Sequence, residues 1–80
     1  MADFEEALES DVEVFEKGVM HRPTGAEFVA YSRTSQSGNL TISRWKSDDG
    51  RIYDERKVRE LLGRCWLKEL DRRGVVVEGR

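Results

Sequence analysis

This sequence has very little cysteine, proline or histidine: its 80 residues include one of each. A lone cysteine, Cys65, cannot form an intrachain disulfide, which excludes a disulfide-stapled scaffold. His21 and Cys65 are the only soft metal ligands. Because a zinc site needs about four such ligands, no metal centre is expected. No uninterrupted apolar run comes near the roughly 18 residues that cross a bilayer, so no membrane-spanning helix is expected.

Aromatic residues are also scarce, at 9% of the chain, and apolar residues make up 38%. This content suits one thin core, so residues 1–80 are expected to form a single small α+β domain. The first residues are acidic and lack the apolar centre of a signal peptide. Together with the lone thiol, they predict a cytoplasmic protein in a reducing compartment.

The charges are unevenly distributed, although the formal net charge is only −2. Residues 1–20 carry seven acids and one base, whereas residues 21–53 and 54–80 each carry a surplus of two bases. This gradient indicates either that the parts neutralise each other in the fold or that two surfaces have opposite sign. A net acidic chain does not favour nucleic-acid binding, for which strongly basic domains are typical.

Apolar spacing near the N-terminus predicts a helix over residues 3–17. The apolar positions recur at steps of three and four, which places them on one helix face: Phe4, Leu8, Val12, Phe15 and Val19. A strand through Val12 and Val14 is the competing interpretation. It is disfavoured here because the alternation of apolar and polar residues breaks at Phe15 and Glu16.

A β-hairpin is predicted in the middle of the chain. Residues 26–34 have no helical period and are rich in residues that favour strands, and residues 40–46 alternate between apolar and polar. The turn-forming residues 35–39 separate them. Asp48-Asp49-Gly50 predicts a second turn, after which residues 51–53 would add a short third strand.

A second helix is predicted over residues 54–73. Asp54 suits its N-cap and Gly74 suits the position after its end. Its apolar face carries Val58, Leu61, Leu62, Cys65 and Trp66. Gly63, inside this helix, is interpreted either as a close approach of another backbone or as a break. The apolar run at residues 75–77 is a candidate edge strand.

The expected fold is therefore a small two-layer α+β domain. It consists of an N-terminal helix, an antiparallel β-hairpin or three-stranded meander, and a C-terminal helix. The segment from Leu67 to Val76 resembles the end of a recognition helix entering the wing of a winged-helix protein, which implies nucleic-acid binding by the C-terminal half. The order of helix, hairpin and helix is similar to that of small head–tail joining proteins of tailed phages. That resemblance implies a phage or bacterial accessory protein.

Nothing in the sequence predicts an enzyme. Cys65 lies beside Arg64 and Lys68, and cations can activate a thiol. It also lies in line with the apolar residues of its helix, where a buried, inert thiol is the usual reading. No glycine-rich phosphate loop is present, and 80 residues leave little room for a pocket. No cofactor and no small-molecule substrate are expected.

The hairpin has more apolar side chains than helices on one face of a small sheet can cover. Either the other face binds a partner or the register differs by one residue, which would exchange the two faces. Aromatic residues beside arginine are typical of interface hot spots. We therefore expect the contact surface to consist of Tyr31, Arg33, Arg44, Trp45 and Lys46. A core position for Trp45 is the equal alternative.

These patterns favour a non-enzymatic protein–protein interaction module, such as an accessory protein, an adaptor or an inhibitor. Its partner would be a larger protein or a second copy of the chain. The alternative is a nucleic-acid-binding module that uses the basic and aromatic hairpin. The acidic first segment opposes this alternative because it would repel phosphate, although an inhibitor could use that segment to mimic nucleic acid.

Overall fold

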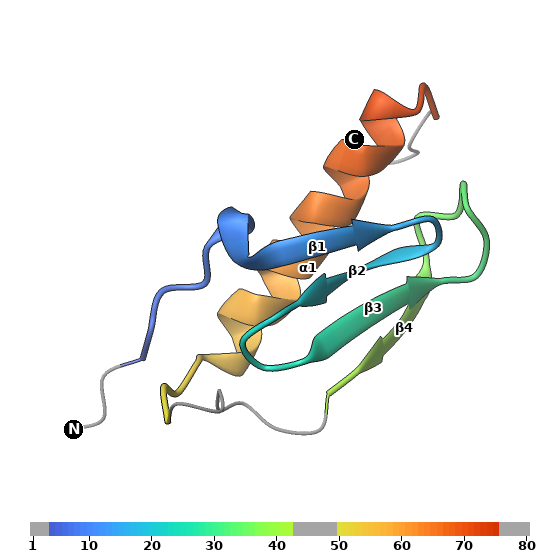
Figure 1. Cartoon of the computed structure of the whole chain (residues 1–80). Helices are drawn as coiled ribbons and strands as arrows, with labels where there is room; N and C mark the ends of the chain where they lie inside the picture. Colours follow the sequence, from blue (N-terminus) through green and yellow to red (C-terminus); the bar gives the residue numbers. More distant parts are fainter. Residues whose placement is uncertain (1–3, 43–49, 76–80) are drawn as a thin grey trace.

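A computed structural model describes residues 4–42 and 50–75 of the chain (Figure 1). Four strands form one antiparallel sheet in sequence order: β1 (Val12–Phe15), β2 (Gly18–His21), β3 (Ala26–Ala30) and β4 (Gly38–Thr41). A short 3₁₀ turn, η1 (Glu9–Asp11), precedes β1. The helix α1 (Glu55–Arg72) packs across one face of the sheet, and no other described helix covers the opposite face (Figure 1).

The predicted helix over residues 3–17 is wrong, and with it the predicted order of helix, hairpin and helix. Val12 and Val14 lie in β1, which pairs with β2 through Val12↔His21 and Val14↔Val19. The break in alternation at Phe15 and Glu16 marks the end of this strand, because the hairpin turn follows directly. β-branched residues at every second position favour the strand, and a short acidic helix without a partner would be marginal in water.

The hairpin predicted in the middle of the chain is present as part of a longer meander. β3 lies within the predicted strand 26–34, and β4 begins at Gly38, inside the segment predicted as a turn. The third strand predicted at residues 51–53 is reduced to an isolated parallel bridge between Glu5 and Tyr53. The predicted Asp48-Asp49 turn, like residues 43–46 of the predicted strand, lies outside the described residues.

The predicted C-terminal helix is confirmed, with bounds close to those expected. The Asp54 side chain caps the helix by accepting a hydrogen bond of 3.0 Å from the Arg56 backbone N–H. Gly74, with φ of +82°, follows the last turn in the left-handed conformation that glycine tolerates best. Both interpretations of Gly63 are wrong. α1 continues through Gly63 without a break, and a Cβ added there would meet no other group within 4 Å, so no backbone approaches it closely. The candidate strand at residues 75–77 has only Val75 within the described residues.

The core lies between α1 and the covered face of the sheet. From the sheet, the core contains Val19, Ala26 and Ala30. The buried apolar residues of the helix are Val58, Leu61, Leu62, Cys65, Trp66 and Leu70. The burial predicted for the helix face is therefore confirmed. Of the five residues on the apolar face of the predicted N-terminal helix, Val19 is buried and Val12 packs against the core. The other three, Phe4, Leu8 and Phe15, are 56%, 45% and 42% exposed. These side chains lie outside the core because the segment is not a helix.

Candidate functional site

The predicted contact residues are only partly within the described structure. Tyr31 follows β3 and is 65% exposed, as a contact residue should be. Arg33 is also exposed, and its guanidinium forms an ion pair of 3.0 Å with the Glu16 carboxylate. Arg44, Trp45 and Lys46 lie outside the described residues. Among the predicted contact residues, Tyr31 is therefore the aromatic residue that lies on the described surface of the protein.

The register of the sheet shows which side chains share the face that α1 leaves uncovered. Residues paired across antiparallel strands point to the same face, and Phe15, Gly18 and Val29 form one such row. Tyr31 lies two residues after Val29, so it points to that face as well. Met20 lies on the next row. We call Phe15, Met20, Val29 and Tyr31 the open-face patch.

The open-face patch is apolar and carries acidic neighbours. Phe15 on the edge strand β1 and Val29 on the inner strand β3 are 42% and 40% exposed and lie on one row of this face, so they form exposed apolar area rather than isolated side chains. The row through Met20 continues to Glu13 on β1 and to Glu27 on β3. The patch therefore offers apolar area with two carboxylates beside it, which suits a partner that carries both apolar and basic groups.

Sequence reasoning missed most of this patch. The sequence pattern places Phe15 on a helix face, and it does not single out Met20 as a contact residue. The signal that could have found Phe15 is the alternation of Val12, Glu13 and Val14, with Glu16-Lys17-Gly18 after Phe15, which is typical of a strand that enters a tight turn. Once that hairpin is recognised, the alternation of side chains along a strand places Phe15 on the face of the sheet opposite to that of Val12 and Val14.

Trp66 in α1 and Arg73 just after it fix the loops at one end of the sheet. The indole Nε1 of buried Trp66 donates a 2.7 Å hydrogen bond to the Ser35 carbonyl in the loop before β4. Arg73, just after α1, lies over the Trp66 ring at 4.9 Å. Its guanidinium donates to three carbonyls in the turns that follow β1 and β3, those of Phe15, Glu16 and Arg33, at 2.8–3.0 Å. We call these contacts the Arg73 clasp.

The carboxylate of Glu69 completes the clasp from within α1. It accepts hydrogen bonds from Arg72 Nε at 2.9 Å and from Arg73 Nε at 2.8 Å. The bonds to Arg72, with those to Arg73, outweigh the effect of burial and lower the pKa of Glu69 to about 2. Glu69 is therefore ionised at neutral pH, and it orients the Arg73 fork toward the loops.

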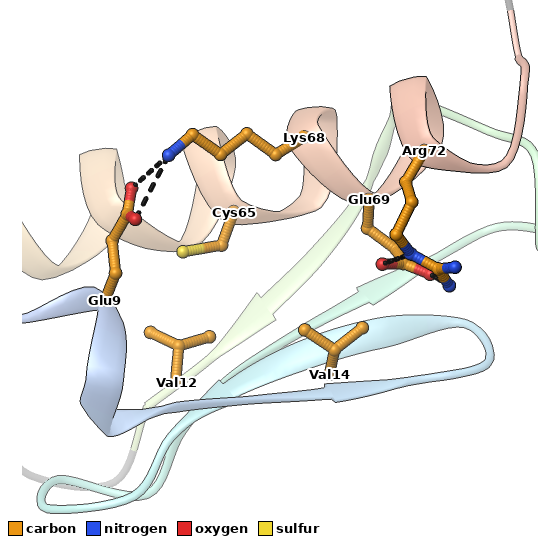
Figure 2. A pocket seen from close by; sticks show the side chains of 7 residues that line it. All are labelled: Glu9, Val12, Val14, Cys65, Lys68, Glu69 and Arg72. Atoms are coloured by element: carbon orange, nitrogen blue, oxygen red, sulfur yellow. Dashed lines mark hydrogen bonds and ion pairs between the residues drawn. The ribbon is translucent and has the colours of Figure 1, made fainter.

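A groove runs between α1 and the outer edge of the sheet at β1 (Figure 2). It has a volume of about 230 Å³. Its lining combines two valines of β1 with side chains of α1 and η1: Glu9, Val12, Val14, Cys65, Lys68, Glu69 and Arg72. The Lys68 ammonium bridges to Glu9 at 2.8 Å, and this contact lowers the pKa of Glu9. We call this feature the edge groove.

The two side chains that could act as a nucleophile or a base, Cys65 and His21, are both buried. Burial raises the pKa of the Cys65 thiol, so the thiolate that a nucleophile needs is disfavoured. His21 is fully buried under Tyr53, with Nδ1 hydrogen-bonded to Thr24 Oγ1 at 2.8 Å. Among the described residues, no hydrogen bond joins His21 to Cys65, so the histidine is not placed to act as a base for the thiol. Among the described residues, no three His, Cys, Asp or Glu side chains are grouped so that they could hold a metal ion.

The comparisons with known proteins identify no relative. No protein-family model matches the chain, and neither the curated proteins nor the solved structures contain a match to it. Within the described part of the chain, no helix has the length and apolar character needed to cross a membrane.

Proposed function

We propose that this chain is a non-enzymatic protein-interaction domain whose contact surface is the open-face patch. The observation that carries the proposal is the exposure of Phe15, Val29 and Tyr31 on the sheet face that no described element covers. Exposed aromatic and aliphatic groups clustered on a rigid sheet are typical of protein-binding surfaces. The Arg73 clasp supports this role because it holds the loops beside the patch in one conformation.

The charge beside the patch favours a protein partner over nucleic acid. Glu13 and Glu27 lie on the same face as the apolar residues and would repel phosphate groups. Two copies joined through this face would bring the four carboxylates close together, which disfavours self-association there. The proposed partner is therefore a different, larger protein that presents apolar and basic side chains.

The proposal can be tested by capturing partners with the purified protein, with and without nuclease treatment. Tyr31→Ala should weaken binding of a captured protein about tenfold or more, because truncating a hot-spot aromatic costs more than 1 kcal/mol of binding. Phe4→Ala is the matched control, since Phe4 is a similarly exposed aromatic (56% against 65%) that is not part of the sheet. This control should bind like the unchanged protein.

Thermal unfolding of both variants would establish that the folded state is retained. The proposal fails if Tyr31→Ala and Phe4→Ala bind equally well. It also fails if nuclease treatment abolishes capture, because the contact would then run through nucleic acid. In that case, affinity should fall steeply with rising salt concentration.

A further inference from the structure

The outer edge of β1 carries backbone groups that are not paired with any described residue. The Arg22 N–H donates a 3.0 Å hydrogen bond to the Asp11 carbonyl, which fixes the alternation of hydrogen-bonded pairs along the hairpin. By that alternation, Glu13 and Phe15 bond to β2, whereas the backbone polar groups of Val12 and Val14 point away from it. The Val12 N–H bonds to the Glu9 carbonyl instead.

Three backbone groups therefore remain at this edge: the Val12 carbonyl, and the N–H and carbonyl of Val14. None of the described residues supplies a backbone partner for them. An added strand could form hydrogen bonds to all three, as happens when an extended peptide extends an exposed sheet edge. The edge is short, so such pairing would need help from side chains.

The edge groove supplies that help. Val12 and Val14 point from β1 toward α1, and Val14 is 45% exposed (Figure 2). A strand paired with Val14 would direct every second side chain to the same face, into the space beside Cys65. The volume of about 230 Å³ accommodates an aliphatic side chain. Backbone pairing would supply affinity, and this space would select the side chain.

The charges around the β1 edge indicate which residues should alternate with the aliphatic residues in a strand added there. Of the acids in and beside β1, Glu9 and Glu16 are paired with Lys68 and Arg33, whereas Asp11 and Glu13 form no ion pair with a described residue. The Arg22 guanidinium, a cation near the start of β1, is engaged with the Ser10 and Asp11 carbonyls. Glu13 lies on the open face, where the remaining side chains of an added strand would point. The rim cations Lys68 and Arg72 are paired with Glu9 and Glu69, so they oppose a basic strand only weakly. A lysine or arginine opposite Glu13 would gain a favourable cross-strand pair.

We propose that the β1 edge and the edge groove bind an extended segment of a partner protein in which aliphatic residues alternate with lysine or arginine. This inference rests on the proposed function and names the form in which a partner would engage the domain. The open-face patch would then contact the body of the partner, while β1 receives one of its strands.

The test uses the peptide acetyl-Lys-Val-Lys-Leu-Lys-Val-Lys-amide and an NMR titration of the full chain. Amide shifts are expected in β1 and in residues 65–72 of α1. The other sheet edge, β4, is an internal control and should not respond. Two further peptides carry N-methyl groups either on all aliphatic residues or on the inner lysines. In a strand paired with β1, only every second N–H group points to β1, and a methyl group on such a nitrogen removes its hydrogen bond. One of the two methylated peptides should therefore not bind, and the other should bind like the unmethylated peptide.

A variant of the chain checks the same contact from the other side. Val14→Pro removes an N–H that points away from β2, and proline is tolerated where an edge strand faces outward. The Val14→Pro variant should fold but should not bind the peptide, whereas the Tyr31→Ala variant should bind the peptide with unchanged affinity. If Val14→Pro does not fold, the methylated peptides still decide the question on the unchanged chain.

The inference is overturned if both methylated peptides bind equally, if the shifts occur at β4, or if folded Val14→Pro binds normally. The proposed function fails on a different result. A captured partner that is lost with Tyr31→Ala but retained with Val14→Pro would support the open-face patch and refute strand addition at β1.

Discussion

At the scale of single residues, His21 is the side chain whose chemistry is most constrained by its surroundings. It is fully buried in β2, its ring contacts the Tyr53 ring edge-on at 4.8 Å, and Thr24 satisfies only one of its two nitrogens. Nε2 has no hydrogen-bond partner among the described residues. Burial disfavours the protonated ring and lowers the pKa of His21, although the Asp11 carboxylate acts in the opposite direction.

The protein should therefore lose stability as the pH falls below neutral. A histidine with a lowered pKa in the folded state binds fewer protons there than in the unfolded chain. Its stabilising effect is complete above about pH 6.5 and is lost as the pH falls through that value toward the lowered pKa. The free energy of unfolding should be smaller at pH 5.5 than at pH 7.5.

Denaturant titrations at the two pH values measure this difference. His21 is the only histidine, so its ring signals in NMR can be followed without ambiguity. A titration midpoint at or above 6.5 in the folded protein would contradict the expectation. His21→Asn retains a polar atom near Thr24 but cannot titrate, so it should flatten the pH dependence between the two values.

Two glycines should respond to alanine in opposite ways. Gly63 is exposed inside α1 with open space around it, so Gly63→Ala should stabilise the protein by about 1 kcal/mol. A Cβ added at Gly18 would meet the Phe28 carbonyl well inside van der Waals contact, so Gly18→Ala should destabilise it by about 1–3 kcal/mol. Urea denaturation measures both changes. Equal stability of the two variants would show that β2 and β3 do not approach as closely as described.

At the scale of elements, α1 does more than cover the sheet. Trp66 and the Arg73 clasp connect its C-terminal end to the turn after β1 and to the loop after β3. Because these carbonyls belong to loops, no regular strand pairing would otherwise fix them. The helix therefore determines the loop conformations beside the open-face patch as well as the burial of the covered face.

Arg73 should matter much more for stability than its neighbour Arg72. The Arg73 side chain is 22% exposed and donates to four acceptors, counting Glu69. The Arg72 side chain is 73% exposed, and Glu69 is its only hydrogen-bond partner among the described residues. Arg73→Ala should cost on the order of 2–3 kcal/mol, as expected for several hydrogen bonds from a charged group. Arg72→Ala is the matched control and should destabilise the protein much less than Arg73→Ala, because the Arg72 side chain is largely exposed to solvent.

Arg73→Lys tests whether shape or charge is responsible. A lysine keeps the charge but lacks the planar fork, so it should recover less than half of the loss. Chemical denaturation gives the free energies, and amide exchange in the two loops reports whether they open first. Full stability in Arg73→Lys would contradict the role assigned to the guanidinium fork.

At the scale of the whole molecule, the acidic N-terminal region and the basic remainder meet in the fold. Lys68 pairs with Glu9, and Arg33 pairs with Glu16, in each case across a long stretch of sequence. The neutralisation expected from the charge gradient is therefore seen at these contacts. Both pairs are largely exposed, so they contribute little to stability. Glu13 and Glu27 lie on the open face without an ion pair to a described residue, which gives that face its acidic character.

The sequence by itself determined α1, its N-cap at Asp54, the burial of its apolar face and the existence of β3 and β4. These features depend on local chemistry: a capping carboxylate, a helical period sustained over five turns, and β-favouring residues between turn signals. Tyr31 as an exposed residue follows from the same local pattern, since one helix layer covers only one face of a small sheet.

Only the tertiary structure decided that residues 12–15 form a strand. Phe4, Leu8, Val12 and Phe15 satisfy a helical period, while Val12 and Val14 satisfy a period of two, and both patterns are present in the same residues. The strand prevails because β2 supplies hydrogen-bond partners and α1 supplies an apolar surface for the two valines. Neither partner is local in the sequence, so the open-face patch, the edge groove and the Arg73 clasp were not predictable from it.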